Sequence, residues 1–154
     1  MSQLKAGDKA PEFTANDQDG KPVSLSNFKG KTVVLYFYPQ DNTPTCTVEA
    51  CDFRDNYQSL LSKGFQVIGV SPDDEKSHKK FIKKHNLPFP LIADTDRKII
   101  DAYGVWGEKK LFGREYMGLL RTTFIIDADG KIAHVIDKVT SATASQQVLD
   151  LMEK

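Results

Sequence analysis

An apolar strand, a turn-rich loop and a cysteine-bearing helix follow one another without interruption between Thr32 and Asp55. The run Val33–Tyr38 is β-branched and aromatic with no polar alternation, which is typical of a strand buried on both faces of a sheet. Pro39 ends the hydrogen-bond ladder of this strand, and residues 40–45 are rich in turn formers. Open α/β sheets bind ligands at the carboxyl ends of their strands, so this loop is the first place to expect a site.

The length and charge of the chain limit the classes of protein to which it can belong. A chain of 154 residues suits one domain, 1–154, that buries roughly two thirds of its unfolded surface. Basic and acidic residues both number 21, so nucleic acid and anionic membranes are not expected partners. The longest apolar run is far too short to span a membrane, and Met1–Lys5 has no apolar signal core, so we expect a cytoplasmic protein. Its two cysteines are then expected to be reduced thiols at rest.

The rest of the chain alternates strands and helices. We predict a short hairpin over 13–16 and 22–25, and strands over 65–70, 91–93, 121–127 and 131–135. Helices are predicted over 45–62 and 75–85, from a cap at Thr95 or Asp96 to Tyr103, and, as an amphipathic helix, over 141–154. Residues 105–118 lack a period and are predicted to form an ordered loop, with aromatics such as Trp106, Phe112 and Tyr116 packed on the body. This order indicates an α/β protein with a thioredoxin-like fold: a central mixed β-sheet flanked by helices, with an N-terminal hairpin extension.

Cys46 is the residue in this stretch with the most distinctive chemistry. It follows Pro44 in the predicted first turn of a helix, beside unpaired backbone N–H groups and the positive end of the helix dipole. Both features favour a thiolate, which reacts with peroxides to give a sulfenic acid that a second thiol can convert to a disulfide. Cys51 is the candidate second thiol. On the residues alone, two inert cysteines buried in a helix are an equally good interpretation.

The spacing of Cys46 and Cys51 has a mechanical consequence. Residues five apart in an intact helix have Cα atoms roughly 8 to 9 Å apart. A disulfide tolerates at most ~7 Å. If the two thiols bond, the first turns of the helix must therefore unwind.

Several strings of the sequence resemble one known family. Residues 39–46, PQDNTPTC, are followed by Glu49-Ala50-Cys51 and later by Arg121–Phe124. Together they resemble the peroxiredoxins, and most closely the peroxiredoxin Q or bacterioferritin comigratory protein subfamily. The PxxxTxxC signature is highly specific in its strand-loop-helix setting. Similarity extends from residues 10–13 to residues 127–130 and includes residues 103–109, so it covers most of the chain.

The resemblance implies a role for each matched residue. Cys46 corresponds to the peroxidatic cysteine, Thr43 to the hydroxyl that holds the peroxide, and Pro39 to a shield against water. Arg121 corresponds to the cation that stabilises the thiolate and the developing negative charge. These roles are chemically reasonable, because a hydroxyl and a guanidinium can donate hydrogen bonds to the peroxide oxygens.

The resemblance also implies a resolving cysteine and a set of partners. Cys51 matches the resolving position five residues on, and Glu49 matches an acidic residue that orients the arginine. The implied substrates are hydrogen peroxide and organic hydroperoxides, the implied reductant is thioredoxin or a similar dithiol, and the implied state is a monomer without metal or organic cofactor. One residue departs from the pattern: Thr45 stands where Gly is common, which adds bulk and restricts the backbone beside Cys46.

Other interpretations of the same residues remain to be weighed. Arg121 and Arg54 are the two candidate partners of Cys46. Alternation along the strand places Arg121 on the same face as Ile125, and a charge among core residues supports a site there. Arg54 lies two helical turns from Cys46, so we prefer Arg121. The three histidines show no metal-like spacing with the cysteines, and we interpret them as surface or structural residues. A disulfide-exchange enzyme or redox sensor, and a thioredoxin-like module with inert thiols, are the alternatives to a peroxidase. The absence of a CxxC motif weighs against disulfide exchange.

Overall fold

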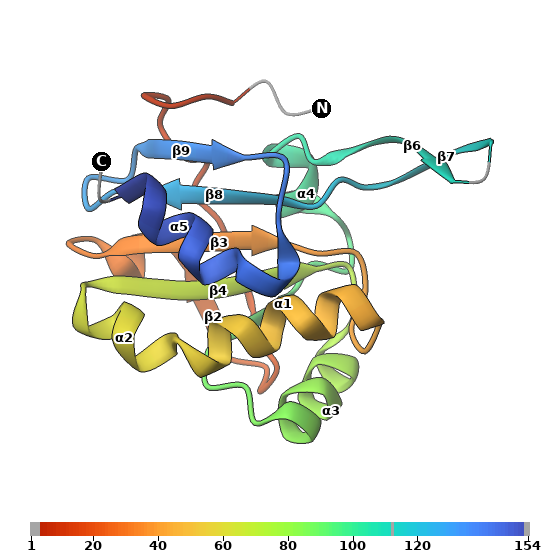
Figure 1. The fold of residues 1–154 in the computed structure, drawn as a ribbon, viewed down its shortest axis with the longest axis horizontal. Helices are drawn as coiled ribbons and strands as arrows, with labels where there is room; N and C mark the ends of the chain where they lie inside the picture. The colour runs from red at the N-terminus through yellow and green to blue at the C-terminus, as the bar shows by residue number, and fades with distance from the viewer. Residues whose placement is uncertain (1–3, 112, 153–154) are drawn as a thin grey trace.

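A five-stranded mixed sheet forms the centre of the computed structural model, which describes residues 4–111 and 113–152 (Figure 1). The strand order is β5-β4-β3-β8-β9. The strands are β3 (Thr32–Phe37), β4 (Phe65–Ser71), β5 (Leu91–Ala93), β8 (Thr122–Ile126) and β9 (Ile132–Ile136). Strands β3, β4 and β5 run parallel, and β8 is antiparallel to both β3 and β9. The predicted α/β fold with a central mixed sheet is confirmed.

Strand β3 lies in the middle of this sheet, and its sequence shows why. Its side chains alternate between two separate cores, with Val34 and Tyr36 in one and Leu35 and Phe37 in the other. Both faces are covered, so neither set of alternating side chains needs to be polar. The uninterrupted apolar run therefore fixes β3 as a central strand.

The helices are α1 (Pro44–Asp55), α2 (Tyr57–Ser62), α3 (Glu75–His85), α4 (Lys98–Ala102) and α5 (Ala144–Met152), with 3₁₀ turns η1 (Leu25–Phe28) and η2 (Ser141–Thr143). Helix α3 has the predicted bounds, and the Asp74 carboxylate caps it by accepting the Ser77 N–H. None of the helices in the described part of the chain has the length and apolar content needed to span a bilayer.

The helix predicted over 45–62 is two helices that meet at Asn56. The Asn56 side chain donates to the carbonyl oxygen of Asp52 at 2.8 Å, and its backbone N–H also bonds to that carbonyl. An asparagine that makes such local bonds offers the chain an alternative to the regular helix. The prediction also placed the start of α4 too early, because Arg97, in a left-handed conformation, precedes the helix. The Asp94 carboxylate accepts the N–H groups of the second and third helix residues, and Asp96, a predicted cap, accepts that of the first.

The prediction of an ordered loop over 105–118 is wrong. Strands β6 (Trp106–Leu111) and β7 (Arg114–Leu119) form an antiparallel hairpin that projects from the body (Figure 1). Much of the hairpin faces solvent, so it lacks the polar–apolar alternation by which strands are recognised. Tyr116 is 43% exposed rather than packed, Trp106 is half-buried against the core and under the Arg97 guanidinium, and Phe112 lies outside the described residues.

The predicted N-terminal hairpin is present as a separate two-stranded sheet. It consists of β1 (Thr14–Asn16) and β2 (Pro22–Ser24), which are antiparallel. The final helix begins with η2 and continues as α5, and residues 153–154 of the predicted range lie outside the described residues. A short loop, residues 38–43, therefore connects the central strand β3 to α1.

Candidate active site

The loop between β3 and α1 meets the start of β8 at one end of the sheet. Phe37, the last residue of β3, pairs with Thr122, the first residue of β8. Arg121 immediately precedes that pair, so the strand register brings it to the end of β3. Ile125 packs in the same core as Cys46, which confirms that Arg121 and Ile125 share the face covered by α1.

Cys46 lies in the first turn of α1, and its side chain is fully buried. Pro44 opens the helix and Thr43 is the N-cap residue, whose carbonyl accepts the Thr47 N–H. A proline at this position supports a helix start because it needs no intrahelical N–H bond there. Nη2 of Arg121 lies 3.1 Å from the Cys46 sulfur. The predicted partnership of a helix-borne thiol with this distant arginine is therefore present in the structure.

Glu49 shares Arg121 with the thiol. Nη1 of Arg121 donates to Oε1 of Glu49 at 2.8 Å, so one guanidinium binds the sulfur and the carboxylate through two different nitrogens. Glu49 is fully buried, and its other oxygen has no hydrogen-bond partner among the described residues. Burial raises the pKa of Glu49 to about 7, although the Arg121 charge acts to lower it. Burial opposes the charge of Arg121, but Cys46 and Glu49 together raise the pKa of the guanidinium.

The hairpin contributes a second cation that the sequence analysis did not single out. Lys109 of β6 is half-buried. Its pKa is lowered by burial and by the charge of Arg121, and the negative charge of Cys46 acts in the opposite direction. Lys109 therefore interacts electrostatically with both Arg121 and Cys46. Its recognition from sequence would have required the hairpin, which was predicted as a loop.

The other predicted site residues lie on the same two elements. Pro39 and Thr43 flank the loop between β3 and α1, both half-buried, and the Thr43 hydroxyl donates to the Gln40 carbonyl at 3.1 Å. Cys51 is half-buried farther along α1, and both cysteines are free thiols. Arg54 binds the His85 carbonyl at 2.8 Å and the adjacent Asp55, so the structure does not make it the partner of Cys46.

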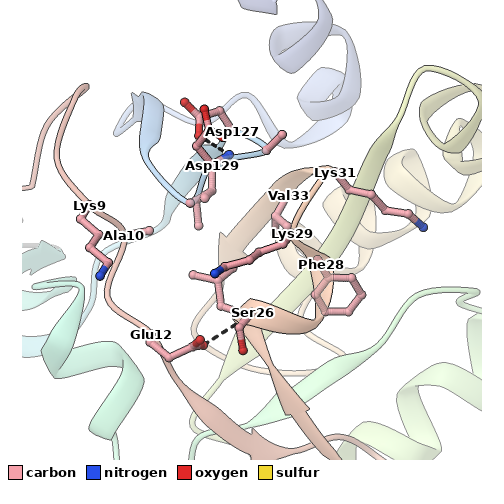
Figure 2. A pocket seen from close by; sticks show the side chains of 14 residues that line it. Lys9, Ala10, Glu12, Ser26, Phe28, Lys29, Lys31, Val33, Asp127 and Asp129 are labelled. Carbon is pink, nitrogen blue, oxygen red and sulfur yellow. Dashed lines mark hydrogen bonds between the residues drawn. The ribbon is translucent and has the colours of Figure 1, made fainter.

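A cavity of about 220 Å³ lies elsewhere on the molecule (Figure 2). Val33, near the start of β3, lines it together with Lys29, Glu12 and the turn residues Asp127 and Asp129. The thiol, by contrast, lies beyond the other end of β3. None of the residues around Cys46 lines this cavity, whereas a larger cavity of about 580 Å³ is lined by Arg121 and Thr122.

Comparison with known proteins identifies the family of the chain. Residues 6–135 match the family model described as the AhpC/TSA family. The chain is 47% identical to peroxiredoxin Bcp of Bacillus subtilis, over 98% of this chain and 99% of that one. It is 44% identical to peroxiredoxin Bcp of Escherichia coli K12, over 100% of this chain and 99% of that one. Among solved structures, a Cys-to-Ser mutant of peroxiredoxin Q from Xanthomonas campestris superimposes with a TM-score of 0.88 at 31% identity, covering 97% of this chain and 98% of that one.

The family determines the class of reaction. Peroxiredoxins are thiol-dependent peroxidases, which take a peroxide as substrate and a thiol as reductant, and their fold is the thioredoxin fold found here. The chain belongs to the AhpC/TSA family, as a peroxiredoxin of the Q/Bcp group.

Proposed function

We propose that Cys46 is the peroxide-reacting thiol and that it reduces hydrogen peroxide and organic hydroperoxides. The observation that carries this proposal is the 3.1 Å contact between Arg121 and the buried Cys46 sulfur at the start of α1. The thiolate attacks the terminal peroxide oxygen, an S–O bond forms and the O–O bond breaks. The products are a sulfenic acid and, after a proton is taken up, water or an alcohol. Arg121 stabilises the negative charge as it moves from sulfur to the leaving oxygen.

Thr43 and Pro39 complete the pocket in this proposal. Both lie on the short connection between β3 and Cys46, so neither can move far from the thiol while α1 is folded. The Thr43 hydroxyl can exchange its bond to the Gln40 carbonyl for a bond to the peroxide. Pro39 has no backbone N–H and limits the access of water. Glu49 fixes the guanidinium of Arg121 through the 2.8 Å hydrogen bond.

Cys51 is the proposed resolving cysteine. Its thiol attacks the sulfur of the Cys46 sulfenic acid, which forms a disulfide and releases water. Both thiols lie on α1 at a spacing that an intact helix holds roughly 8 to 9 Å apart between Cα atoms, beyond the ~7 Å limit of a disulfide. The first turns of α1 must therefore unwind during each cycle. Thioredoxin or a similar dithiol then reduces the disulfide and is itself oxidised.

The working state of the protein is also a proposal. We propose that the enzyme acts as a monomer in the cytoplasm. We also propose that it needs no cofactor, because the reaction balances with two cysteines, one peroxide and one dithiol. Light scattering of the reduced protein would test the monomer. Steady-state turnover with a thioredoxin system and, separately, a glutaredoxin system would identify the reductant.

Cysteine variants test the assignment of the two thiols. Cys46→Ser should abolish peroxide turnover, because the nucleophile is gone. Cys51→Ser should still consume one equivalent of peroxide and then accumulate sulfinic acid at Cys46. Mass spectrometry of each variant after peroxide treatment gives the oxidised residue. Oxidation of Cys51 before Cys46 in the wild-type protein would reverse the assignment.

A further inference from the structure

Asp41 is a buried acid in the middle of the loop between β3 and α1, with only 6% of its surface exposed. Three groups converge on its carboxylate. The Tyr38 hydroxyl donates to Oδ1 at 2.6 Å and the Ser77 hydroxyl donates to Oδ2 at 2.8 Å. Nδ1 of His78 lies 2.7 Å from Oδ2. An acid that looks like a turn former in sequence is thus bound to the end of β3 and to the first turns of α3.

A direct hydrogen bond joins Asp41 and His78. Nε2 of His78 lies 2.9 Å from the carbonyl oxygen of Ile92, and a carbonyl only accepts, so Nε2 carries a proton. One further proton lies between Nδ1 of His78 and Oδ2 of Asp41, which are 2.7 Å apart. The two side chains are 0% and 1% exposed, and such a pair is costly to break because a buried polar group is left without its partner.

The backbone around Asp41 is held as firmly as its side chain. The Asp41 N–H donates to Oδ2 of Asp73 at 2.7 Å, and the Ser71 hydroxyl donates to the same oxygen. Asn42, the next residue, has a φ of 62°, a left-handed conformation that is uncommon for residues other than glycine. These bonds keep the loop in that turn immediately before the helix cap at Thr43.

Asp41, Asp73 and His78 also have the composition of a metal site. Their polar atoms are, however, engaged with Tyr38, Ser77, Ser71 and Ile92, and the 2.7 Å between Nδ1 and Oδ2 suits a shared proton. The group is therefore best described as a hydrogen-bonded anchor between the loop and α3.

We propose that Asp41 and His78 are positioning residues for peroxide reduction. The pair fixes the loop against α3 and β5, so that Pro39 and Thr43 are held beside the Cys46 thiol. Because none of the partners of Asp41 and His78 lies on α1, the anchor stays in place when the first turns of α1 unwind and can guide their refolding. This inference rests on the proposed function, in which Cys46 attacks the peroxide.

The test is Asp41→Asn in a Cys51→Ser background, where Cys46 is the single thiol. Two rates are measured on the same protein: oxidation by hydrogen peroxide, and alkylation by iodoacetamide, which needs the thiolate but no peroxide pocket. We expect the peroxide rate constant to fall about ten- to a hundredfold, as for a misplaced positioning group. The alkylation rate should stay close to that of the parent protein.

Ile132→Ala is the matched control for lost stability, since Ile132 is buried in β9 and takes no part in the loop or its bonds. An equal fall of the peroxide rate in Ile132→Ala, an unchanged rate in Asp41→Asn, or a joint fall of both Asp41→Asn rates would overturn the proposal. If Asp41→Asn does not fold, Tyr38→Phe, which removes only the hydroxyl donor, takes its place. A lower peroxide rate with an unchanged alkylation rate would support the proposal, and an unchanged peroxide rate would overturn it. A parent protein that does not react with peroxide would refute the proposed function instead.

Discussion

Replacement of Glu49 by Gln should change how the stability of the reduced protein depends on pH. Glu49 is fully buried, with one oxygen 2.8 Å from Arg121 and the other without a hydrogen-bond partner among the described residues. Burial raises its pKa from 4.5 to about 7 despite the nearby guanidinium. Gln has nearly the same shape and does not titrate, so a comparison of the two proteins isolates this carboxyl group.

The direction of the effect follows from where the proton is held. In the unfolded chain Glu49 loses its proton near pH 4.5, whereas in the folded protein it keeps the proton until about pH 7. Between these values the folded state binds more protons, so stability falls as the pH rises. The contribution of the protonated carboxyl is complete below pH 4.5 and is lost as the pH passes about 7. At about 1.4 kcal/mol per pH unit, the loss is about 3 kcal/mol.

Urea unfolding of both proteins between pH 5 and pH 8, under reducing conditions, measures this loss. The difference in free energy of unfolding should shift by about 2 to 3 kcal/mol in favour of Glu49→Gln across that range. Other titrating groups are common to both proteins and cancel in the difference. A difference that does not change with pH would show that Arg121 fully compensates the burial of the carboxylate, and the reasoning would be refuted.

Two further substitutions test one contact in the site and one in the core. Arg121→Lys should slow the oxidation of Cys46 by peroxide about a hundredfold, because an ammonium lacks the forked pair of nitrogens that binds the sulfur and the carboxylate together. Stopped-flow kinetics measure this rate. Equal slowing in the control Arg54→Lys would contradict the prediction. Gly69→Ala should lower the free energy of unfolding in urea by about 1 to 3 kcal/mol. A Cβ at this position would lie 2.6 Å from Leu91 Cδ2 and 3.0 Å from the Tyr36 ring. An unchanged midpoint of urea unfolding would contradict the prediction and show that these neighbours move at little cost.

The features that could be predicted from the sequence are those that a local pattern determines. The apolar run of β3 has few alternatives to a central strand, because both of its faces require burial. Arg121 could be assigned to the site through the family resemblance, and its place on the core-facing side of a strand supported this, because a charge there needs buried partners such as Cys46 and Glu49. Helix α3 could be bounded from its cap at Asp74 and its basic last turn.

The features that could not be predicted depend on partners distant in the chain. Asp41 is indistinguishable from an ordinary turn residue until Ser77 and His78 are brought beside it. Lys109, whose pKa the charges of Arg121 and Cys46 affect, lies on a hairpin that largely faces solvent, so no alternation identifies its strands. The break at Asn56 arises because its side chain competes for the Asp52 carbonyl, which a helical pattern of apolar residues does not reveal.

The composition of α1 indicates how far the helix must unwind for Cys51 to reach Cys46. Its first two turns bury only a thiol, the Glu49 carboxyl and the methyl of Ala50, and their largest apolar side chain, Val48, is 45% exposed. Opening these turns therefore exposes little apolar surface, and their β-branched residues are weaker helix formers than alanine or leucine.

The later part of α1 is held differently. Phe53 is fully buried, and the Asp52 carboxylate accepts the N–H of Ser145 at the start of α5 at 2.7 Å. Unwinding past Asp52 would expose an aromatic ring and leave the end of a second helix uncapped. Cys51 lies immediately before this boundary, so it is the last residue of α1 that can be released without loss of the contacts of Asp52 and Phe53. The five-residue spacing thus matches the segment of α1 that buries little apolar surface, although its release breaks the bonds of Arg121 to Glu49 and Cys46.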